Sequence, residues 1–366
     1  MIEGIMPEKI RVAVLYGGRS TEHSVSCVSA GAIMSHLDPQ RFEIIPVGIT
    51  TDGVWTVGTT DTDSLRIQDR TLPSVTLTDP KDELFLSVNP LRKGEIRRID
   101  GSLYATADVI FPVLHGKFGE DGTIQGLFEL SGVPYVGTGV LSSAAAMDKE
   151  YTRHMLHEAG LPIGKGITVT ADGRRSITEA DKEYLGLPVF VKPARGGSSI
   201  GVSKVSSWDK LQEALDLAFA NDSKAIIEAE NRGVEVECGV LEYADGRVVA
   251  VPPAQLQGTE SGDEGFYGFD TKYLDNVVAA LIPAPLDEKT LQEVQDISIK
   301  AFHAIDGMGL SRVDFFITEN GPVINEINTM PGFTPISMYP QVFAAAGVSY
   351  DTLLSILIDQ ALSAVR

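Results

Sequence analysis

Two polar stretches near the carboxyl end of the chain combine acidic side chains with an arginine and an amide. In the first stretch, Arg312 and Asp314 flank an apolar residue. In the second, Glu326 and Asn328 do the same. Both stretches have the composition of β-strands, in which alternate side chains share one face. Carboxylate and amide oxygens suit Mg²⁺, which takes one or two carboxylates and completes its shell with water and phosphate. The spacing indicates a magnesium site for a phosphorylated ligand, and the alternative is a solvated strand pair with ordinary surface charges.

The turn between these stretches decides whether the two acids meet. A two-residue loop would put Asp314 and Glu326 on opposite faces of the hairpin. A three-residue loop, Glu319–Gly321, with its glycine in the left-handed bulge position, pairs Thr318 with Pro322 and Asp314 with Glu326. We predict the three-residue loop, which brings the two acidic residues about 5 Å apart.

A second candidate lies in residues 191–201, where a strand-like run delivers Lys192 into a stretch of small residues. The backbone N–H groups of such a stretch can surround phosphate oxygens. The spacing is not that of a Walker-type loop. The alternative is a plain Gly/Ser hairpin, but the lysine directly before the loop favours a phosphate site.

Composition limits the partners of the protein. The 366 residues include 30 Lys and Arg against 50 Asp and Glu, a formal net charge of −20. This charge repels phosphate backbones and anionic lipids, so we expect no nucleic-acid or membrane partner, and a phosphorylated ligand would need local cations or a divalent metal. Cys27 and Cys238 have neither disulfide nor zinc-site spacing, and the first residues lack a signal-peptide pattern. We expect reduced thiols and a cytoplasmic protein.

Strands alternate with helices in the first part of the chain, which is typical of an open parallel sheet. The expected strands are Ile10–Leu15, Phe42–Ile49 and Ala107–Leu114, and the expected helices are Ser20–Leu37 and Thr123–Ser131. Ligands of such sheets bind beyond the carboxyl ends of the strands, where Gly17-Gly18 and His115-Gly116 fall. Between Thr51 and Thr106 we find no chemical motif and predict nothing specific.

From about Val136 the pattern becomes that of a smaller α+β unit. Its expected elements are helices Asp148–Ala159 and Trp208–Phe219 and strands Leu187–Val191, Ile200–Val205 and Ala225–Glu230. A glycine-rich acidic loop (Gly258–Asp270), a helix (Asp287–Ile305), the polar hairpin and a helix from Tyr350 follow.

Seven short motifs over nearly the whole chain are together similar to those of the ATP-grasp superfamily and, within it, of the D-alanine–D-alanine ligase family. In chain order they are GGRSTEHSVS (Gly17–Ser26), HGKFGEDG (His115–Gly122), MDK (Met147–Lys149), KPARGGSSIG (Lys192–Gly201), Phe266-Tyr267 with Lys272-Tyr273, RVD (Arg312–Asp314) and EINTMPG (Glu326–Gly332). Each alone is weak, but seven in this order are specific. The resemblance implies an α/β ATP-grasp fold in which an N-terminal open parallel sheet domain (1–137) precedes two α+β domains that enclose the nucleotide. These are a central domain (138–231) and a C-terminal domain with the metal site and a lid loop (232–366).

The resemblance implies a ligase that uses ATP to phosphorylate the carboxylate of one D-alanine, after which the amine of a second D-alanine attacks the D-alanyl phosphate. The products are D-alanyl-D-alanine, ADP and phosphate, and the dipeptide serves peptidoglycan synthesis and thus the cell wall and cell shape. Two Mg²⁺ (or Mn²⁺) ions would be held on the transferred phosphoryl group by Asp314, Glu326 and Asn328. Arg312 and the backbone N–H of Gly332 would stabilise the oxyanion.

The same resemblance implies the nucleotide contacts. Lys149, Lys192 and Lys272 would bind the ATP phosphates and so supply local cations inside an acidic protein. Adenine and ribose contacts would come from Glu228, Ala229, Glu230, Asn231 and Glu235, with Glu235 on the ribose hydroxyls and the 229–231 backbone on the adenine edge. Without the resemblance, these acids would be read as a solvated charge cluster.

The substrate contacts are also implied by resemblance. Glu22 would hold the ammonium of the first D-alanine, and Ser198 and Tyr273 would link to it when the lid closes. Further contacts would come from His115 and Glu120, and, at the carboxylate of the second D-alanine, from Ser337 and the backbone of Met338. Taken alone, Glu22 is equally consistent with a helix-capping acid, and a single histidine near a strand end is more often structural.

Two further expectations follow from the resemblance. Tyr273 favours D-alanine over D-lactate as second substrate, so Tyr273→Phe should weaken that discrimination. A homodimer should form through helices of the N-terminal domain. Two other functions stay open: another ATP-grasp ligase, such as a biotin-carboxylase-like or amino-acid ligase, and a non-catalytic protein that uses Mg²⁺-ATP as a switch. The Glu22 motif disfavours the former, and Arg312 beside the metal acids disfavours the latter.

Overall fold

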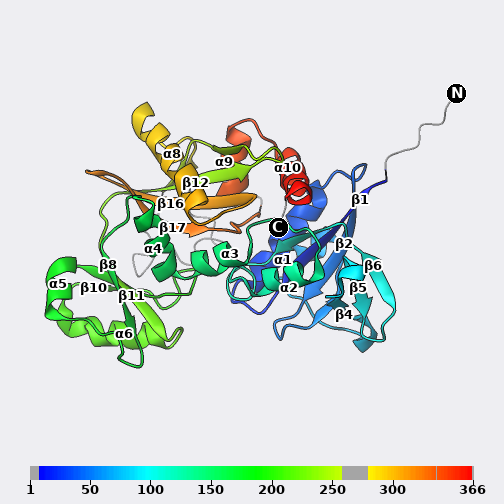
Figure 1. The fold of residues 1–366 in the computed structure, drawn as a ribbon, viewed down its shortest axis with the longest axis horizontal. Coiled ribbons are helices and arrows are strands. Elements are labelled where there is room, and N and C mark those ends of the chain that lie inside the picture. The colour runs from blue at the N-terminus through cyan, green and yellow to red at the C-terminus, as the bar shows by residue number, and fades with distance from the viewer. Residues whose placement is uncertain (1–7, 258–278, 335, 365–366) are drawn as a thin grey trace. The chain divides into compact units, whose positions relative to one another are not determined.

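The computed structural model describes residues 8–257, 279–334 and 336–364, which form two compact units (Figure 1). The first unit comprises the described residues up to Gly137, the short segment Glu242–Arg247 and the described residues from Gly332 onward. The second comprises the described residues of Thr138–Leu241 and Val248–Pro331. The division into three domains after residues 137 and 231 stays a prediction.

The first unit is built on a seven-stranded sheet with the order β6-β5-β4-β3-β2-β1-β7. Its strands are β1 (Ile10–Gly17), β2 (Phe42–Ile49), β3 (Trp55–Val57), β4 (Glu83–Leu86), β5 (Glu95–Arg98), β6 (Leu103–Thr106) and β7 (Val109–Val113). β1 pairs in parallel with both β2 and β7, as the alternation of strands and helices predicts. The apolar residues from Val12 to Leu15 are fully buried, which is typical of a central parallel strand.

The segment between Thr51 and Thr106 adds the four strands β3 to β6, which pair antiparallel. Strands of three or four residues are too short to show a periodic pattern, which is why the sequence predicts nothing there. Short 3₁₀ helices η1 (Thr62–Leu65), η2 (Pro80–Asp82) and η3 (Pro90–Arg92) connect them.

The helices of the first unit are α1 (His23–His36), α2 (Thr123–Ser131), α9 (Met338–Ala345) and α10 (Tyr350–Ser363). α1 begins later than expected because residues 21–22 form a turn. In the part of the chain that the structure describes, no single helix is long and apolar enough to cross a membrane. α9 and α10 would pass that test only as a pair bent by 105°.

The second unit contains a four-stranded antiparallel sheet with the order β10-β9-β11-β8. Its strands are β8 (Gly166–Thr170), β9 (Val189–Pro193), β10 (Ser203–Val205) and β11 (Lys224–Ala229). Packed with it are α5 (Glu179–Leu185), the 3₁₀ helix η4 (Trp208–Lys210) and α6 (Leu211–Phe219). Buried aliphatic residues from β9, β11 and α6 form one cluster, so the predicted α+β unit is confirmed.

A six-stranded sheet completes the second unit, in the order β15-β14-β12-β16-β17 with β13 beside β12. Its strands are β12 (Val234–Glu242), β13 (Val248–Ala250), β14 (Ala254–Gln257), β15 (Ala279–Leu281), β16 (Leu310–Thr318) and β17 (Gly321–Asn328). The accompanying helices are α3 (Val140–Met147), α4 (Lys149–Glu158) and α8 (Glu288–Ala304). Side chains of α8, β12, β16 and β17 share one apolar core.

The hairpin β16–β17 differs from the prediction in its turn. Thr318 pairs with Gly321, so the turn is formed by the two residues Glu319 and Asn320, and the predicted three-residue loop is wrong. Gly321 has φ of 107°, a left-handed value that favours glycine, but it is a strand residue here. A regular ladder from this turn would pair Asp314 with Asn325 and turn Glu326 to the opposite face.

A β-bulge corrects the register. Phe315 pairs with Ile324 but Asp314 pairs with Glu326, so Asn325 is the extra residue. From there onward Arg312 pairs with Asn328. The predicted pairing of the two acids is therefore confirmed, although the bulge rather than the turn produces it.

Candidate active site

A row of three carboxylates crosses the larger sheet of the second unit. Glu237 on β12 lies opposite Asp314 on β16, and Asp314 lies opposite Glu326 on β17. Paired residues of antiparallel strands project to the same face with Cβ atoms about 5 Å apart. Two of the three acids are predicted from the sequence, whereas Glu237 is missed. The sequence feature that could have revealed Glu237 is the Val-Glu-Val-Glu run at 234–237, in which Glu235 and Glu237 share one strand face.

Arg312 neutralises part of this carboxylate row. Its Nε and Nη2 donate to Oδ1 and Oδ2 of Asp314 at 2.7 and 2.6 Å. Its Nε also lies 3.2 Å from Oε2 of Glu237. All three side chains are buried. Because one guanidinium faces three carboxylates, including Glu326, the row carries excess negative charge that a bound cation could balance.

The ionisation of the row reflects this imbalance. Burial is the largest effect on Asp314 and raises its pKa, Arg312 lowers it, and Glu237 and Glu326 raise it again, to about 7 overall. Burial lowers the pKa of Arg312, but Asp314 and Glu237 outweigh burial and raise it well above its ordinary value. A divalent cation beside Asp314 would favour its ionised form.

The donor set fits a hard cation. Asn328 Nδ2 donates to Asp314 Oδ2 at 3.0 Å, which leaves the amide oxygen of Asn328 outside that hydrogen bond. A carboxylate that accepts a bidentate arginine still has lone pairs for a metal. Among the described residues, no group of three or more His, Cys, Asp and Glu side chains is arranged to hold a metal. The fit therefore rests on Asp314, Glu326 and the Asn328 amide, completed by phosphate and water.

Lys149 connects the carboxylate row to the loop at 194–201. Its Nζ lies 3.7 Å from Glu326 Oε2 and donates to the Gly196 carbonyl at 2.8 Å. Its backbone N–H donates to the Ala194 carbonyl at 3.0 Å. The structure thus brings a predicted phosphate ligand beside a predicted metal ligand.

Lys192 and Glu228 form a second cluster. Lys192 Nζ on β9 lies 2.5 Å from Glu228 Oε2 on β11, and Arg153 Nη1 donates to Glu228 Oε1 at 3.1 Å. Burial raises the pKa of Glu228, but Lys192 and Arg153 outweigh burial and hold that pKa below its usual value. Arg153 is missed from the sequence, although it follows Lys149 by four residues and so lies on the same helix face.

The loop after β9 joins the antiparallel strands β9 and β10 and contains unusual backbone conformations. Ser198 and Ser199 have φ of 51° and 58°, left-handed values that are uncommon for residues other than glycine. Such strain persists where the surrounding structure imposes it, often at ligand sites. Arg195 fixes the base of the loop, because its N and Nε donate to Asp222 Oδ2 at 2.9 and 3.0 Å.

The predicted adenine edge lies where β11 ends. The Ala229 N–H donates to the Lys165 carbonyl at 3.0 Å, and the Glu230 N–H donates to the Pro188 carbonyl at 3.1 Å. Asn231 packs so closely on Gly164 that a Cβ there would lie 2.4 Å from its Nδ2. These bonds hold the 229–231 backbone, and its adenine contact stays a prediction.

The two glutamates of this region differ. Glu230 binds Lys204 and Arg232 at 2.6 and 2.7 Å, as expected of a charge cluster near the surface. Glu235 is half-buried, and burial, followed by Glu237 and Glu326, raises its pKa. Its predicted ribose contact would add hydrogen-bond donors to a carboxylate that stands among other acids.

In the first unit, the loops that follow β1 and β7 lie against each other. Glu22 is the N-cap residue of α1 and makes no side-chain capping hydrogen bond, so a charge interaction with the helix dipole stays the alternative to a substrate role. A Cβ at Gly116 would lie 3.0 Å from Glu22 Oε2. The Gly116 N–H donates to Glu120 Oε2 at 2.7 Å. Two predicted substrate residues therefore adjoin the same glycine.

Three buried polar side chains on one face of α1 hold these loops: His23, Ser26 and Ser29. Ser29 Oγ lies 3.5 Å from Nε2 of His115, which is buried. Ser26 Oγ accepts the Gly17 N–H at 2.7 Å and donates to the Val113 carbonyl. The sequence prediction misses them, and the feature that could have revealed them is the spacing of three polar residues at intervals of three along α1.

His23 uses both ring nitrogens. Its Nε2 accepts the Val75 N–H at 2.9 Å, and its Nδ1 lies 2.8 Å from the Gly18 carbonyl. Because Nε2 accepts, Nδ1 carries the proton and the ring is neutral. The ring thus joins the turn after β1 to the segment between β3 and β4.

The second predicted subsite lies at the start of α9. Ser337 Oγ accepts the Thr334 N–H at 3.0 Å, and the Ser337 N–H donates to the Thr334 carbonyl at 2.9 Å. Met338 is the first residue of the helix, where backbone N–H groups favour an anion. Gly332 belongs to this unit and Arg312 to the other, so their joint role at the oxyanion stays a prediction.

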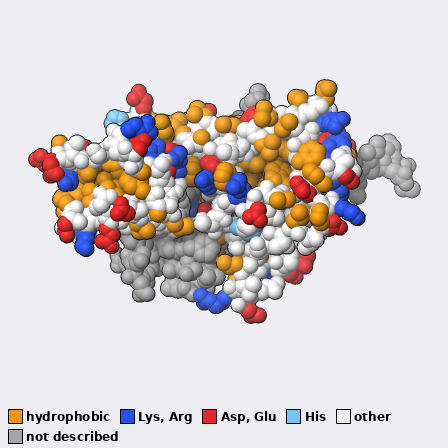
Figure 2. Space-filling model, turned by 90° about the horizontal axis from the view of Figure 1, so that it is seen from below, with side chains coloured by type: hydrophobic (Ala, Val, Ile, Leu, Met, Phe, Trp, Pro, Cys, Tyr) orange, Lys and Arg blue, Asp and Glu red, His pale blue; other side chains and the backbone are white. Residues whose placement is uncertain are grey.

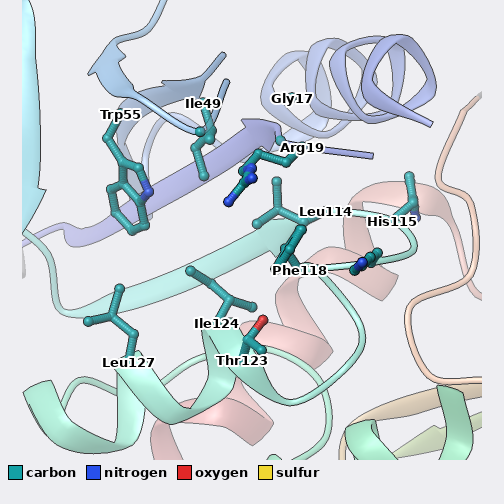
Figure 3. Close-up of a pocket in the computed structure, with 14 residues that line it drawn as sticks. Gly17, Arg19, Ile49, Trp55, Leu114, His115, Phe118, Thr123, Ile124 and Leu127 are labelled. Carbon is teal, nitrogen blue, oxygen red and sulfur yellow. The ribbon is translucent and has the colours of Figure 1, made fainter. Parts of the chain in front are cut away.

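A pocket of about 200 Å³ opens at the carboxyl ends of β1 and β7 in the first sheet (Figure 3). The loops after β1 and β7 and the start of α2 line it, and Arg19 extends over it. The Arg19 guanidinium carbon lies 4.6 Å from the ring centre of Phe118. Apolar and cationic groups therefore adjoin His115, which is part of the lining.

Cationic and acidic side chains are mixed on the surface of the protein. Figure 2 shows Lys and Arg side chains among Asp and Glu side chains on the face that it presents.

Lys272 and Tyr273 lie outside the described residues, as do Phe266 and Tyr267. Their roles in a closing lid stay predictions.

Known proteins are similar to this chain over nearly its whole length. Residues 11–138 match the model of the D-ala D-ala ligase N-terminus, and residues 155–359 match that of the D-ala D-ala ligase C-terminus. A protein named D-alanine–D-alanine ligase from Corynebacterium efficiens is 64% identical over 97% of each chain. Another of that name, from Corynebacterium diphtheriae, is 65% identical over 97% of this chain and 96% of its own.

Solved structures are similar over the same length. VanG D-Ala:D-Ser ligase from Enterococcus faecalis has a TM-score of 0.82 at 34% identity, covering 97% of this chain and 100% of its own. The D-alanine-D-alanine ligase from Coxiella burnetii has a TM-score of 0.81 at 30% identity, covering 97% and 94%. The chain has the ATP-grasp fold and belongs to the D-alanine–D-alanine ligase family.

Proposed function

We propose that this chain joins two D-alanine molecules into D-alanyl-D-alanine, converts ATP to ADP and phosphate, and so supplies peptidoglycan synthesis. Relatives that share about two thirds of its residues bear the name of this activity. The observation that carries the proposal is the row of Glu237, Asp314 and Glu326 with Arg312 bound to it and Lys149 beside it. This arrangement suits charge that develops on a phosphoryl group and an acyl oxygen.

In the first step, a carboxylate oxygen of one D-alanine forms a bond to the γ-phosphorus and the bond from that phosphorus to ADP breaks. Mg²⁺ or Mn²⁺, two ions held by Asp314, Glu326 and Asn328, would neutralise charge on the transferred group when bound. Lys149 and Lys192 would bind phosphate oxygens, and Lys272 would join them. Their present carboxylate and carbonyl partners hold both described lysines in place for this role.

In the second step, the amine of the other D-alanine attacks the acyl carbon, the bond to phosphate breaks, and the amine loses a proton. The tetrahedral intermediate carries an oxyanion, which Arg312 and the Gly332 N–H would stabilise. Loss of one such donor costs about 10²- to 10³-fold in kcat in other enzymes. The neighbouring carboxylates of Asp314 and Glu237 outweigh the effect of burial and keep Arg312 charged for this purpose.

The remaining groups would orient the substrates and the nucleotide. Glu22 would bind the ammonium of the first D-alanine, with Ser198, Tyr273, His115 and Glu120 around it. Ser337 and the Met338 N–H would bind the second carboxylate. Adenine and ribose would contact residues Glu228 to Asn231 and Glu235.

The experiment is to incubate the purified chain with Mg²⁺-ATP and D-alanine, measure ADP and phosphate, and identify the product by mass spectrometry. We expect one phosphate per D-alanyl-D-alanine, no product without metal, and none with L-alanine. ATP turnover without that dipeptide would instead indicate another ATP-grasp ligase, and nucleotide binding without turnover would indicate a switch. Because one solved relative is named a D-Ala:D-Ser ligase, D-serine and D-lactate are tested as second substrates, with Tyr273→Phe as the comparison variant.

A homodimer in the cytoplasm, where ATP is available, is part of the proposal. Sedimentation of the purified chain tests the dimer, and cell fractionation tests the location. A monomer at micromolar concentration would contradict the first expectation.

A further inference from the structure

A buried ion-pair cluster lies beside the nucleotide site without taking part in the steps above. It consists of Asp148, Glu150 and Lys224, each less than 9% exposed. Lys224 Nζ lies 2.8 and 2.6 Å from the two carboxylate oxygens of Asp148 and 2.7 Å from Glu150 Oε2. Arg175 binds the outer side of Glu150. Four charged groups thus meet where α4 begins and β11 begins.

The backbone at this cluster closes a second set of bonds. The Ala194 N–H donates to the Lys224 carbonyl at 2.9 Å, and the Lys149 N–H donates to the Ala194 carbonyl at 3.0 Å. Asp148 also caps α4 by accepting the Glu150 N–H. Lys224 therefore holds α4 with its side chain and the loop after β9 with its carbonyl.

Lys149 stands between these two attachments. Its neighbours in sequence, Asp148 and Glu150, are both bound by Lys224, and its own side chain reaches Gly196 at 2.8 Å and Glu326 at 3.7 Å. A shift of α4 would move Lys149 relative to both the loop and the carboxylate row. Displacements of about 1 Å in a binding group can cost about 10²-fold in rate.

We propose that Asp148 and Lys224 are positioning residues for nucleotide binding, which fix Lys149 against the loop at 194–201. The inference rests on the proposed function in taking Lys149 as a phosphate ligand. A purely structural ion pair would affect stability alone, whereas this role affects binding of the nucleotide and spares that of D-alanine.

The test measures the dissociation constant of a non-hydrolysable ATP analogue with Mg²⁺ by calorimetry, the KM for D-alanine at saturating ATP, and the thermal unfolding midpoint. The variants are Lys224→Met, Lys224→Arg, and a triple variant that combines Asp148→Asn, Glu150→Gln and Lys224→Met. The triple variant leaves no unpaired charge buried, so it should fold even where Lys224→Met alone does not. Lys149→Ala serves as the reference for loss of the ligand itself. Asp108→Asn is the matched control, because Asp108 accepts two hydrogen bonds from the Arg11 guanidinium in the first unit.

We expect the triple variant to weaken nucleotide binding about tenfold, Lys224→Arg to retain most of it, and both to leave the KM for D-alanine within about twofold. Unchanged nucleotide binding in the folded triple variant would overturn the inference, as would an equal loss in Asp108→Asn. Unchanged binding in Lys149→Ala would overturn it together with the assigned role of Lys149. Nucleotide binding that depends on Lys224 in a protein that makes no dipeptide would support the inference while the proposed function fails.

Discussion

Hydrogen bonds between side chains and backbone groups hold the candidate substrate loops of the first unit, whereas buried ion pairs hold the candidate phosphate and metal residues of the second. His23, Ser26 and Ser29 act on backbone groups and on His115. Lys224 forms ion pairs with Asp148 and Glu150, and Arg312 forms ion pairs with Glu237 and Asp314. Glu326 is a fifth carboxylate, whose charge also attracts Arg312.

The ligands account for this difference. ATP is highly charged, so its site needs fixed cations, and cations buried without partners are costly. Carboxylates that hold these cations before the nucleotide arrives reduce that cost. An amino acid carries one charge of each sign, and its loops need accurate backbone positions more than additional charge. The two units should therefore respond differently to mutation and to pH.

The largest effect is expected at Arg312. Arg312→Met removes the cation from the carboxylate row and leaves Asp314 and Glu237 buried together, which costs about 3–5 kcal/mol of unfolding free energy. It also removes the proposed oxyanion donor, and we expect a loss of about 10²- to 10³-fold in kcat. Urea unfolding and steady-state kinetics measure the two effects. Arg312→Lys is the control for charge, and wild-type stability in Arg312→Met would contradict the account of the row.

The second effect is on acid stability. Burial would raise the pKa of Glu150, but Arg175 and Lys224 lower it from 4.5 to about 2. Lys224 also faces Asp148 and the ring of Tyr151. A lowered carboxyl pKa stabilises the folded state above about pH 4.5, and this contribution, roughly 3 kcal/mol, is lost as the pH falls toward 2.

Urea unfolding of wild type and Glu150→Gln at several pH values measures this contribution. The difference in unfolding free energy should fall by about half between pH 5 and pH 3. A difference that does not change with pH would show that the ion pairs of Glu150 do not contribute in this way.

A smaller effect is expected in the first unit. His23→Ala removes two neutral hydrogen bonds and leaves the Val75 N–H and the Gly18 carbonyl without that partner, which costs about 1–3 kcal/mol. The KM for D-alanine should rise and the dissociation constant for the nucleotide should not, because the ring acts on the turn beside Glu22. Calorimetry with the ATP analogue and kinetics with D-alanine separate the two.

The smallest effect is expected at Ser29. Ser29→Ala removes a contact of 3.5 Å to His115 and should change stability by no more than about 1 kcal/mol, with a small rise in the KM for D-alanine. Thermal unfolding and kinetics measure both. A loss as large as that of Arg312→Met would erase the contrast between the two units.

Much of the fold and part of the site follow from local sequence. The apolar run of β1 predicts a buried parallel strand, and the alternation of Arg312 with Asp314 and of Glu326 with Asn328 predicts two strands that each carry a polar face. The strands between Thr51 and Thr106 are missed because three or four residues contain too little of a periodic pattern. Glu237 is missed because its pairing with Asp314 joins positions far apart in the chain.

The sequence by itself determined which residue types are available for chemistry and which short elements carry them, because both depend on neighbours along the chain. Only the tertiary structure decided that a bulge at Asn325 places Glu326 opposite Asp314, that Lys224 binds the residues on both sides of Lys149, and that His23 is neutral. Each of these depends on register, burial or a distant hydrogen-bond partner. Such contacts arise when segments far apart in the chain are brought together by burial of apolar surface, so no local pattern encodes them.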